Sequence, residues 1–276
     1  MNTTTIAHET PRAHSRGGLL ADLKLVAWQV RYEQRGFWRN RRRSLFSFAF
    51  PLMFLLIFGE LGHGQHIKTR GNLSLIDFYV PGIIAYAILV IGFSNMAMMI
   101  ANLRETGIIK RMRSTPMPWV AYLAGITLNS VLTVFASVVV LLAVGTGLMG
   151  AHVRSSTLPG LIVTVVLGTA CFTTLAIAAS RLIPNPDSGM PILMFVTLPL
   201  SFISNVFFPL DGAPAWLESI ARTFPLRPLA DALETAFDPR THGNGLVGHD
   251  LSTLLIWTAI GCFAMVRTMR MLSARD

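Results

Sequence analysis

Residues 102–116 read Asn-Leu-Arg-Glu-Thr-Gly-Ile-Ile-Lys-Arg-Met-Arg-Ser-Thr-Pro and separate two long apolar runs, yet this segment is too polar to cross lipid. On a helix, Ile108, Ile109 and Met112 would share one face, with the charged side chains elsewhere. This pattern predicts a short helix that binds a partner protein. On the residues alone, a basic loop that only fixes the orientation in the membrane is an equal alternative.

The runs on either side belong to a set of apolar stretches, each near the roughly 20 residues that a helix needs to cross about 30 Å of hydrocarbon. They lie at 44–62, 78–101, 120–149, 158–180, 189–210 and 251–266. The 276 residues are 52% hydrophobic and 13% charged, with a mean hydropathy of +0.54. Lipid must therefore surround most of the chain. We predict an all-α, polytopic membrane protein with six transmembrane helices.

Lys and Arg indicate the orientation, because such residues concentrate in cytoplasmic loops. The segments 1–43, 102–116, 181–188 and 267–276 hold 17 of the 23 basic residues. Both termini are therefore predicted to be cytoplasmic. The excess of Arg over Lys, 20 to 3, is typical of a GC-rich genome and points to a bacterial plasma membrane. The basic residues flank apolar runs, which favours contact with membrane lipids over nucleic acid.

The chain before the first apolar run divides into two parts. Residues 1–18 are expected to form a disordered cytoplasmic tail, followed by an amphipathic helix and basic linker over 19–43. Apolar and polar residues alternate there at helical spacing, which predicts a helix lying on the inner leaflet. The alternative is that 19–43 extends the first span into water, but Gly36 and the basic stretch after it favour two separate helices. Residues 44–276 would form a single transmembrane domain.

The segment 211–237 holds two short stretches, Pro214–Phe224 and Pro228–Phe237, that begin with prolines suited to the first turn of a helix. Each is too short to span the bilayer, so we expect a re-entrant extracellular hairpin between spans 5 and 6. An ordinary surface loop with helices is the alternative. The polar and aromatic residues singled out in the hairpin are Trp216, Glu218, Arg222, Asp231 and Glu234.

A short extracellular loop with His63, His66 and Arg70 is expected after the first span. Two histidines without further ligands fall short of a zinc site, so a solvated loop is the better interpretation.

Several activities are disfavoured by what the sequence lacks. No Gly-Lys dipeptide occurs, so the phosphate-binding loop of many ATPases is missing. The ionisable residues Glu60, Asp77, Arg181, Asp187 and Asp250 fall at the ends of spans, whereas ion-coupled carriers usually need such a group at mid-depth. No nucleophile and base pattern of a hydrolase is evident. An outside source of energy is the simpler interpretation.

Two stretches carry a resemblance to a known family. Arg104-Glu105-Thr106-Gly107, Lys110-Arg111-Met112-Arg113-Ser114-Thr115-Pro116 and Tyr122-Leu123-Ala124-Gly125 form the first. Asn185-Pro186, Pro199-Leu200-Ser201-Phe202-Ile203-Ser204, Phe207-Phe208-Pro209-Leu210, Pro214-Ala215-Trp216-Leu217 and Phe224-Pro225-Leu226 form the second. Together they resemble type-2 ATP-binding-cassette export permeases of the daunorubicin-resistance class. The chain departs from the family pattern at Asn205, Phe224 and Ile126, which leaves the substrate class open.

The resemblance implies a half-transporter that pairs with a second permease copy or paralogue above two separate ATPase subunits. ATP and magnesium would bind those subunits, with no cofactor in this chain. By resemblance, 102–116 would be the coupling helix, and the helix of 19–43 would brace the same ATPase. Coupling is assigned to the charged residues Arg104, Glu105, Lys110, Arg111 and Arg113 and the apolar anchors Ile108, Ile109 and Met112.

The expected function is export of a hydrophobic drug, antibiotic or lipid. Spans 2 and 5 with the hairpin are the candidate substrate path, with side chains that suit an apolar cargo at Met194, Phe195, Phe202, Phe207 and Phe208. For each residue singly, lipid contact or core packing is an equal interpretation. A polysaccharide or glycolipid exporter is the alternative within transport, although the chain has only four tyrosines to line a polar channel. A non-transporting membrane scaffold or sensor is the alternative from another class.

Overall fold

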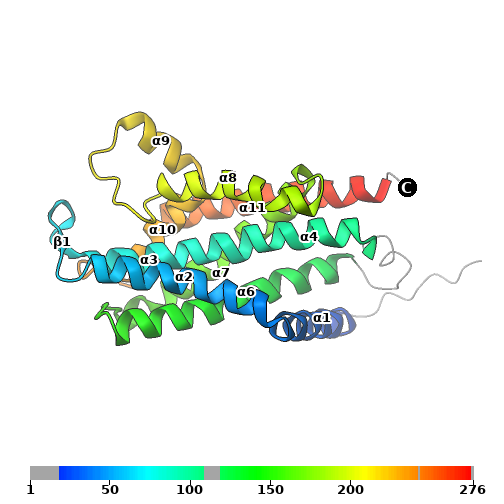
Figure 1. Ribbon diagram of the computed structural model, residues 1–276, viewed down its shortest axis with the longest axis horizontal. Helices are drawn as coiled ribbons and strands as arrows, with labels where there is room; N and C mark the ends of the chain where they lie inside the picture. The colour runs from blue at the N-terminus through cyan, green and yellow to red at the C-terminus, as the bar shows by residue number, and fades with distance from the viewer. Residues whose placement is uncertain (1–18, 109–118, 242, 275–276) are drawn as a thin grey trace, which may run out of the picture.

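The computed structural model describes residues 19–108, 119–241 and 243–274, and it is helical almost throughout (Figure 1). The long helices are α1 (Leu19–Arg39), α2 (Arg41–Leu61), α3 (Leu75–Ile88), α4 (Asn95–Glu105), α6 (Trp119–Gly147), α7 (Leu158–Ala179), α8 (Pro186–Phe202) and α11 (Gly248–Ala274). The shorter elements are α9 (Ala215–Thr223), α10 (Leu226–Glu234), the π-helical η2 (Leu89–Ser94), the 3-10 turns η1 (Lys68–Arg70), η3 (Ser155–Thr157) and η4 (Ser180–Leu182), and the strands β1 (His66–Ile67) and β2 (Leu73–Ser74). The tail predicted over 1–18 lies outside the described residues.

Five segments of the described chain are long and apolar enough to cross a membrane. They are Ser44–Leu61, Leu75–Glu105, Ala121–Gly147, Ser155–Leu182 and Gly248–Thr268. The second passes from α3 through η2 into α4 without a break, which places a π-helical segment inside one span. The bundle lies lengthwise in Figure 1, with β1 at one end and α1 at the other. We refer to these as the β1 end and the α1 end.

The remaining predicted span, 189–210, is wrong at its C-terminal boundary. Helix α8 has 17 residues and ends at Phe202, which gives it a length of about 25 Å at 1.5 Å per residue. Three residues later, Asn205 adopts a left-handed backbone conformation with φ of 62°, which no α-helix continues through. Residues 203–210 therefore leave the helix. A sixth transmembrane crossing stays a prediction.

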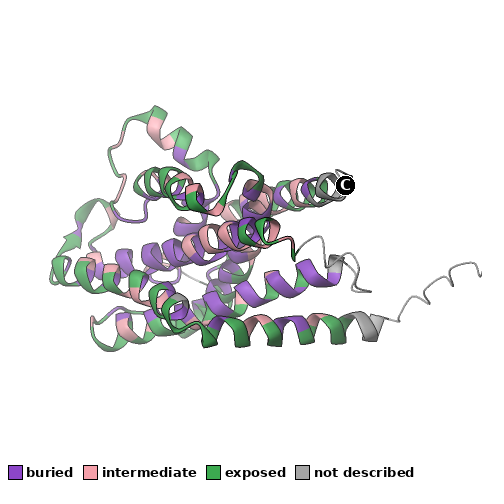
Figure 2. Ribbon diagram, turned by 45° about the vertical axis from the view of Figure 1, so that its right-hand side comes forward, coloured by how far each residue is buried: buried purple, intermediate pink, exposed green. Residues whose placement is uncertain are grey.

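The core of the bundle is built around α3, whose residues from Ile76 to Ile88 are all buried. Figure 2 shows this buried strip running through the middle of the molecule. Helix α3 packs against α2, α6 and α10, while α7 packs along α11. Lipid tails are as apolar as these side chains, so close packing between helices holds the bundle more than the hydrophobic effect does.

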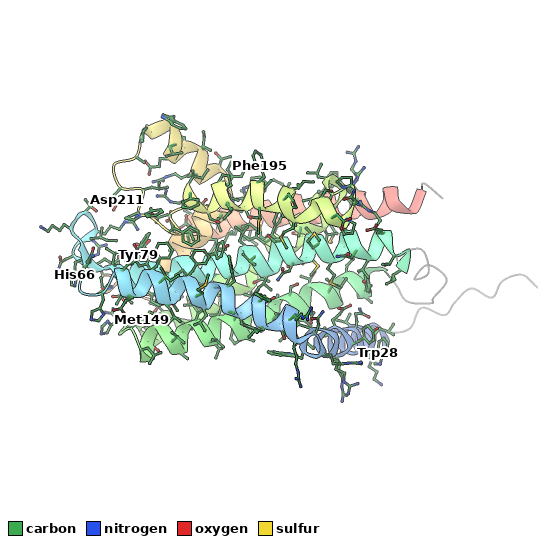
Figure 3. All side chains as sticks on the ribbon, viewed as in Figure 1. Trp28, His66, Tyr79, Met149, Phe195 and Asp211 are labelled. Atoms are coloured by element: carbon green, nitrogen blue, oxygen red, sulfur yellow. The ribbon has the colours of Figure 1, made fainter. Side chains whose placement is uncertain are left out.

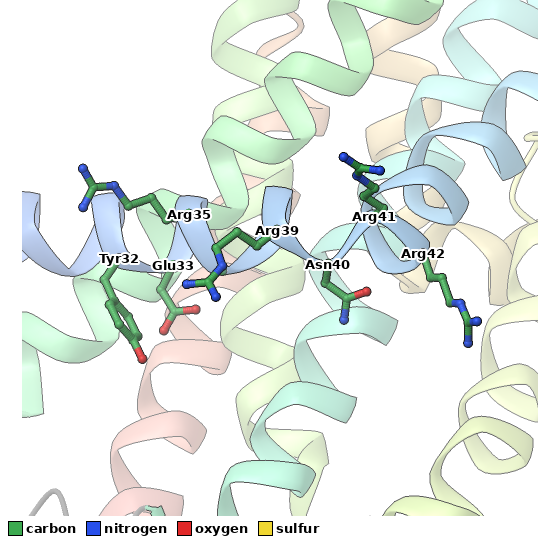
Figure 4. A pocket seen from close by; sticks show the side chains of 8 residues that line it. Tyr32, Glu33, Arg35, Arg39, Asn40, Arg41 and Arg42 are labelled. Carbon is green, nitrogen blue, oxygen red and sulfur yellow. The ribbon is translucent and has the colours of Figure 1, made fainter.

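Helix α1 is separate from α2, so the alternative of one continuous first helix is wrong. The break falls at Asn40 and not at Gly36, which lies inside α1. The basic residues expected in a linker instead form the first turn of α2, which begins at Arg41. In Figure 4, α1 runs across the spanning helices. It packs along α6, where Gln34 Nε2 donates to Thr133 Oγ1 at 3.2 Å, and its buried Phe37 contacts Phe48 of α2.

The two helices predicted within 211–237 are present, but they differ in burial. Helix α9 projects from the bundle in Figure 1, and only Ala221 in it is buried. Helix α10 starts at Leu226, two residues before the predicted Pro228, and packs against α3, α7 and α11. Its residues Leu226 and Leu229 are fully buried. The alternative of an ordinary surface loop is therefore wrong for α10, which is buried in the bundle.

Candidate functional site

Arg70 is the centre of a charged network at the β1 end. It lies in η1, within the turn closed by antiparallel pairing of His66 with Ser74. Its Nη1 donates to both carboxylate oxygens of Glu234 in α10 at 2.7 Å. Its Nε donates to Asp211 Oδ2 at 2.9 Å. The Arg70 and Glu234 side chains are only 14% and 15% exposed, so this ion pair is largely removed from solvent.

Asn205 joins this arginine to a second ion pair. Its Oδ1 accepts a hydrogen bond from Arg70 Nη2 at 3.1 Å, and its Nδ2 donates to Asp231 Oδ1 at 3.0 Å. Asp231 in turn accepts from Arg227 Nε at 2.8 Å. The left-handed conformation of Asn205 points its amide into this position, and asparagine adopts that conformation more readily than most residues. We call these residues the Arg70 network: Arg70, Asn205, Asp211, Arg227, Asp231 and Glu234.

The Arg70 network contains two guanidinium groups and three carboxylates, so its formal charge is close to balanced. Hydrogen bonds from Arg70 are the main reason that the pKa of Asp211 lies below its usual value, and Thr69 Oγ1 adds a further bond at 2.8 Å. The Nη1 atom of Arg227 is buried without a hydrogen-bond partner in the described structure. Among the described residues, no group of three or more histidine, cysteine or acidic side chains is arranged to hold a metal ion. The geometry suits a clamp between η1, the chain after α8, and α10.

Aromatic side chains gather next to the Arg70 network. Phe207 is 2% exposed, and its ring centroid lies 5.1 Å from that of Tyr86 and 5.3 Å from that of Phe54. Phe202 and Phe208 stack on each other with ring centroids 6.0 Å apart. Phe202 also contacts Phe207, and Phe208 contacts Phe58, so both belong to the same cluster. The structure therefore brings together three of the five residues predicted for the substrate path.

Met194 and Phe195 do not join that cluster. They lie on an exposed face of α8, where Phe195 is 82% exposed (Figure 3). A lipid or another helix would cover such a side chain inside a membrane, so Phe195 does not line an internal path in the single chain.

The structure describes three of the predicted coupling residues, which lie at the α1 end. Arg104 donates hydrogen bonds to the backbone carbonyl oxygens of Ser180, at 3.3 Å, and of Ile183. Its guanidinium thus fastens the end of α4 to the turn between α7 and α8. Glu105 is exposed and Ile108 is 38% exposed. The rest of the predicted coupling helix lies outside the described residues, including Ile109, Lys110, Arg111, Met112 and Arg113.

The predicted hairpin residues divide between two environments. Asp231 and Glu234 belong to the Arg70 network. Trp216 is 64% exposed, and Glu218 pairs with Arg222 at 2.7 Å on the exposed face of α9. The pair of Arg227 and Asp231 could have been found from the sequence, since residues four apart meet on one helix face. No local pattern indicates the contact between Arg70 and Asp211, which lie 141 positions apart.

Long apolar helices packed side by side define the chain as a multi-pass membrane protein. Residues 25–237 match the ABC-2 type transporter family, and the chain belongs to this family, which confirms the resemblance found in its sequence. A relative is the daunorubicin resistance ABC transporter permease protein DrrB1 of Streptomyces coeruleorubidus, 28% identical over 193 residues. The aligned part spans 66% of this chain and 64% of the relative.

Proposed function

We propose that the chain is the membrane-spanning permease subunit of an ATP-driven exporter that moves an apolar drug, antibiotic or lipid out across a bacterial plasma membrane. The observation that carries this proposal is the family match over 25–237, which includes both the segment 102–116 and the hairpin α9–α10. A separate ATPase supplies the energy and binds ATP and magnesium. A second permease copy or paralogue completes the path, with two ATPase subunits below.

The coupling step begins where α4 leaves the bundle. The chain after Glu105 carries the basic and apolar residues predicted to dock on the ATPase. Arg104 holds the base of this segment to η4. A displacement of the docked segment is therefore passed to the turn that precedes α8, because rigid helices joined by hydrogen bonds move together.

Helix α8 connects the two ends of the molecule. Its N-terminus follows the turn that Arg104 holds, and its C-terminus leads within three residues to Asn205 in the Arg70 network. A shift of α8 along its axis would pull on Asn205 and so on the clamp that fixes α10. We assign the Arg70 network to the closed state of the extracellular side.

The aromatic cluster supports an apolar cargo. Phe207 lies two residues after Asn205 of the clamp and packs with Phe54 and Tyr86. Phe202 and Phe208 are half-exposed at the edge of this cluster. A cargo moves only if the closed and open states bind it differently, and opening of the clamp would change the surroundings of these rings. The name of the relative refers to daunorubicin resistance, which agrees with a drug as the cargo.

Charge reversal in the docking segment tests the proposal. Arg111→Glu with Arg113→Glu should abolish ATP-dependent uptake of a fluorescent apolar drug into inverted vesicles, while membrane insertion stays normal. Arg222→Gln on exposed α9 is the matched control at the opposite end, and it should transport normally. Unchanged transport by the double variant would refute the docking assignment.

The partner is identified by purification from the native membrane in mild detergent, followed by mass spectrometry. A Walker-motif ATPase that copurifies with the wild type, and is lost from the Arg111→Glu and Arg113→Glu variant, supports the exporter. A chain that purifies alone and transports nothing favours the scaffold or sensor.

A further inference from the structure

A basic cleft lies where α1 meets α2, at the α1 end of the bundle. Its volume is about 830 Å³, and it opens to the surface. Figure 4 shows the arginines Arg35, Arg39, Arg41 and Arg42 around it, together with Glu33 and Asn40. The cleft exists because α1 crosses the bundle while α2 turns into it, which leaves the bend at Asn40 uncovered.

The arginines of the cleft are available to a ligand. Each of the four is exposed, and none of their guanidinium groups forms an ion pair or hydrogen bond with another residue that the structure describes. The one carboxylate among the lining residues belongs to Glu33, which already accepts a hydrogen bond from Gln29 Nε2 at 2.9 Å. The cleft therefore carries a strong excess of positive charge. Guanidinium groups bind phosphate through paired, charge-assisted hydrogen bonds.

The position of the cleft matches the headgroup layer of a membrane. The apolar part of α2 begins at Ser44, two residues after Arg42, or about 3 Å along the helix. Trp28 and Trp38 on α1 are 63% and 53% exposed, and such aromatic rings concentrate at the boundary between lipid and water. This places the arginines at the level of lipid phosphates.

An apolar surface continues directly from the cleft. Leu45 and Phe46, in the turn after the basic residues, are 65% and 68% exposed. A ligand that fits both features has a negatively charged head and a long apolar tail. Inorganic phosphate would leave the apolar surface uncovered.

We propose that this cleft is a binding site for an anionic phospholipid of the adjoining leaflet, with the headgroup bound among the arginines of the cleft and an acyl chain along Leu45 and Phe46. The bound lipid would fill the bend between α1 and α2 and so fix the angle at which α1 crosses α6. The site is independent of whether the chain transports any substrate.

The test uses the purified full chain in nanodiscs of equal parts phosphatidylcholine and phosphatidylglycerol, with retained lipid measured by native mass spectrometry after transfer to detergent. Wild type should retain phosphatidylglycerol preferentially. Arg39→Gln with Arg41→Gln should lose this preference, each change lowering the apparent affinity about fivefold. Arg31→Gln, on the same helix but outside the cleft, removes an equal charge per residue and should behave as wild type.

A double Arg39→Lys and Arg41→Lys variant controls for folding, because it keeps the charge and should retain part of the preference. Equal enrichment of phosphatidylglycerol in wild type and the Gln variant would overturn the proposal. So would displacement of the lipid by millimolar inorganic phosphate, which would show a site for free anions. Loss of a copurifying ATPase with unchanged lipid retention would also overturn it and assign the cleft to protein docking.

Discussion

The Arg70 guanidinium donates two hydrogen bonds of 2.7 Å to Glu234, which lies 164 residues further along the chain. This contact joins the turn after the first span to α10. Asn205, in the chain after α8, forms hydrogen bonds with both Arg70 and Glu234. Three segments that are distant in the sequence therefore depend on one guanidinium group. Its removal leaves buried carboxylates without a counter-charge, and this consequence can be measured.

We predict that Arg70→Gln destabilises the protein by about 3 kcal/mol, because one partner of a buried ion pair is lost while the other stays behind. The measurement is the midpoint of thermal unfolding in detergent. Arg222→Gln is the control, since its pair with Glu218 is exposed and should contribute no more than about 0.5 kcal/mol. Equal shifts for the two variants would contradict the role given to Arg70. The double change of Arg70→Gln with Glu234→Gln should recover part of the loss.

At Asn205 the backbone conformation and the side chain can be tested separately. Asn205→Gly keeps the left-handed backbone but loses the hydrogen bonds to Arg70 and Asp231, so we expect a moderate loss of about 1–2 kcal/mol. Asn205→Val loses the same bonds and also strains the backbone, because a β-branched residue disfavours positive φ. Valine should therefore be clearly worse than glycine in thermal unfolding. If the two variants were equally stable, backbone strain at this position would be unimportant.

Much of the bundle was predictable because the length and apolarity of a span are local properties of the sequence. The spans around 44–62, 78–101, 120–149 and 158–180 were placed within a few residues of the structure. The end of the fifth was missed since residues 203–210 remain apolar after the helix has ended. Hydropathy does not detect a turn made by one left-handed asparagine.

The candidate site was predictable only where its contacts are local. Arg227 and Asp231 are four residues apart on one helix, whereas Arg70 meets its partners only after the whole bundle has formed. Arg70 was therefore interpreted as part of a solvated loop, and its side chain is instead mostly buried. Arg104 was assigned to the ATPase by resemblance, and the structure gives it backbone partners within its own chain.

Arg104 provides a test of the proposed route by which a displacement of residues 102–116 reaches η4 and α8. We predict that Arg104→Gln still copurifies with the ATPase but loses most ATP-dependent transport, because its hydrogen bond to Ser180 is lost. ATP hydrolysis without transport would be the signature of this uncoupling. Loss of the ATPase from the purified complex would instead show that Arg104 binds the partner directly. Arg181→Gln, an exposed neighbour in η4, is the matched control for charge.

Close packing between α3 and the chain after α8 rests on Gly82. A methyl group at this position would overlap the backbone carbonyl oxygen of Val206, which no side-chain rotation can relieve. We expect Gly82→Ala to cost about 1–3 kcal/mol through this overlap. Gly147→Ala is the control, because nothing lies within 4 Å of the added methyl group and alanine favours the helix. Thermal unfolding should therefore shift downward for the first variant and stay level or rise for the second.

Acid should weaken the clamp through Asp211. Its pKa is lowered in the folded protein, chiefly by hydrogen bonds from Arg70, so the ionised form contributes stability at neutral pH. That contribution is fully present above the ordinary pKa of about 4 and is lost as the pH falls through the lower folded value. Asp211→Asn lacks it at every pH. We predict that wild type and Asp211→Asn differ in unfolding temperature at pH 7 and converge as the pH falls below about 4.

Glu234 responds in the opposite direction, because burial raises its pKa, but it is present in both chains and cancels in the comparison. A constant difference between the two chains from pH 7 to pH 3 would show that the Asp211 carboxylate stabilises the clamp by its shape and not by its charge.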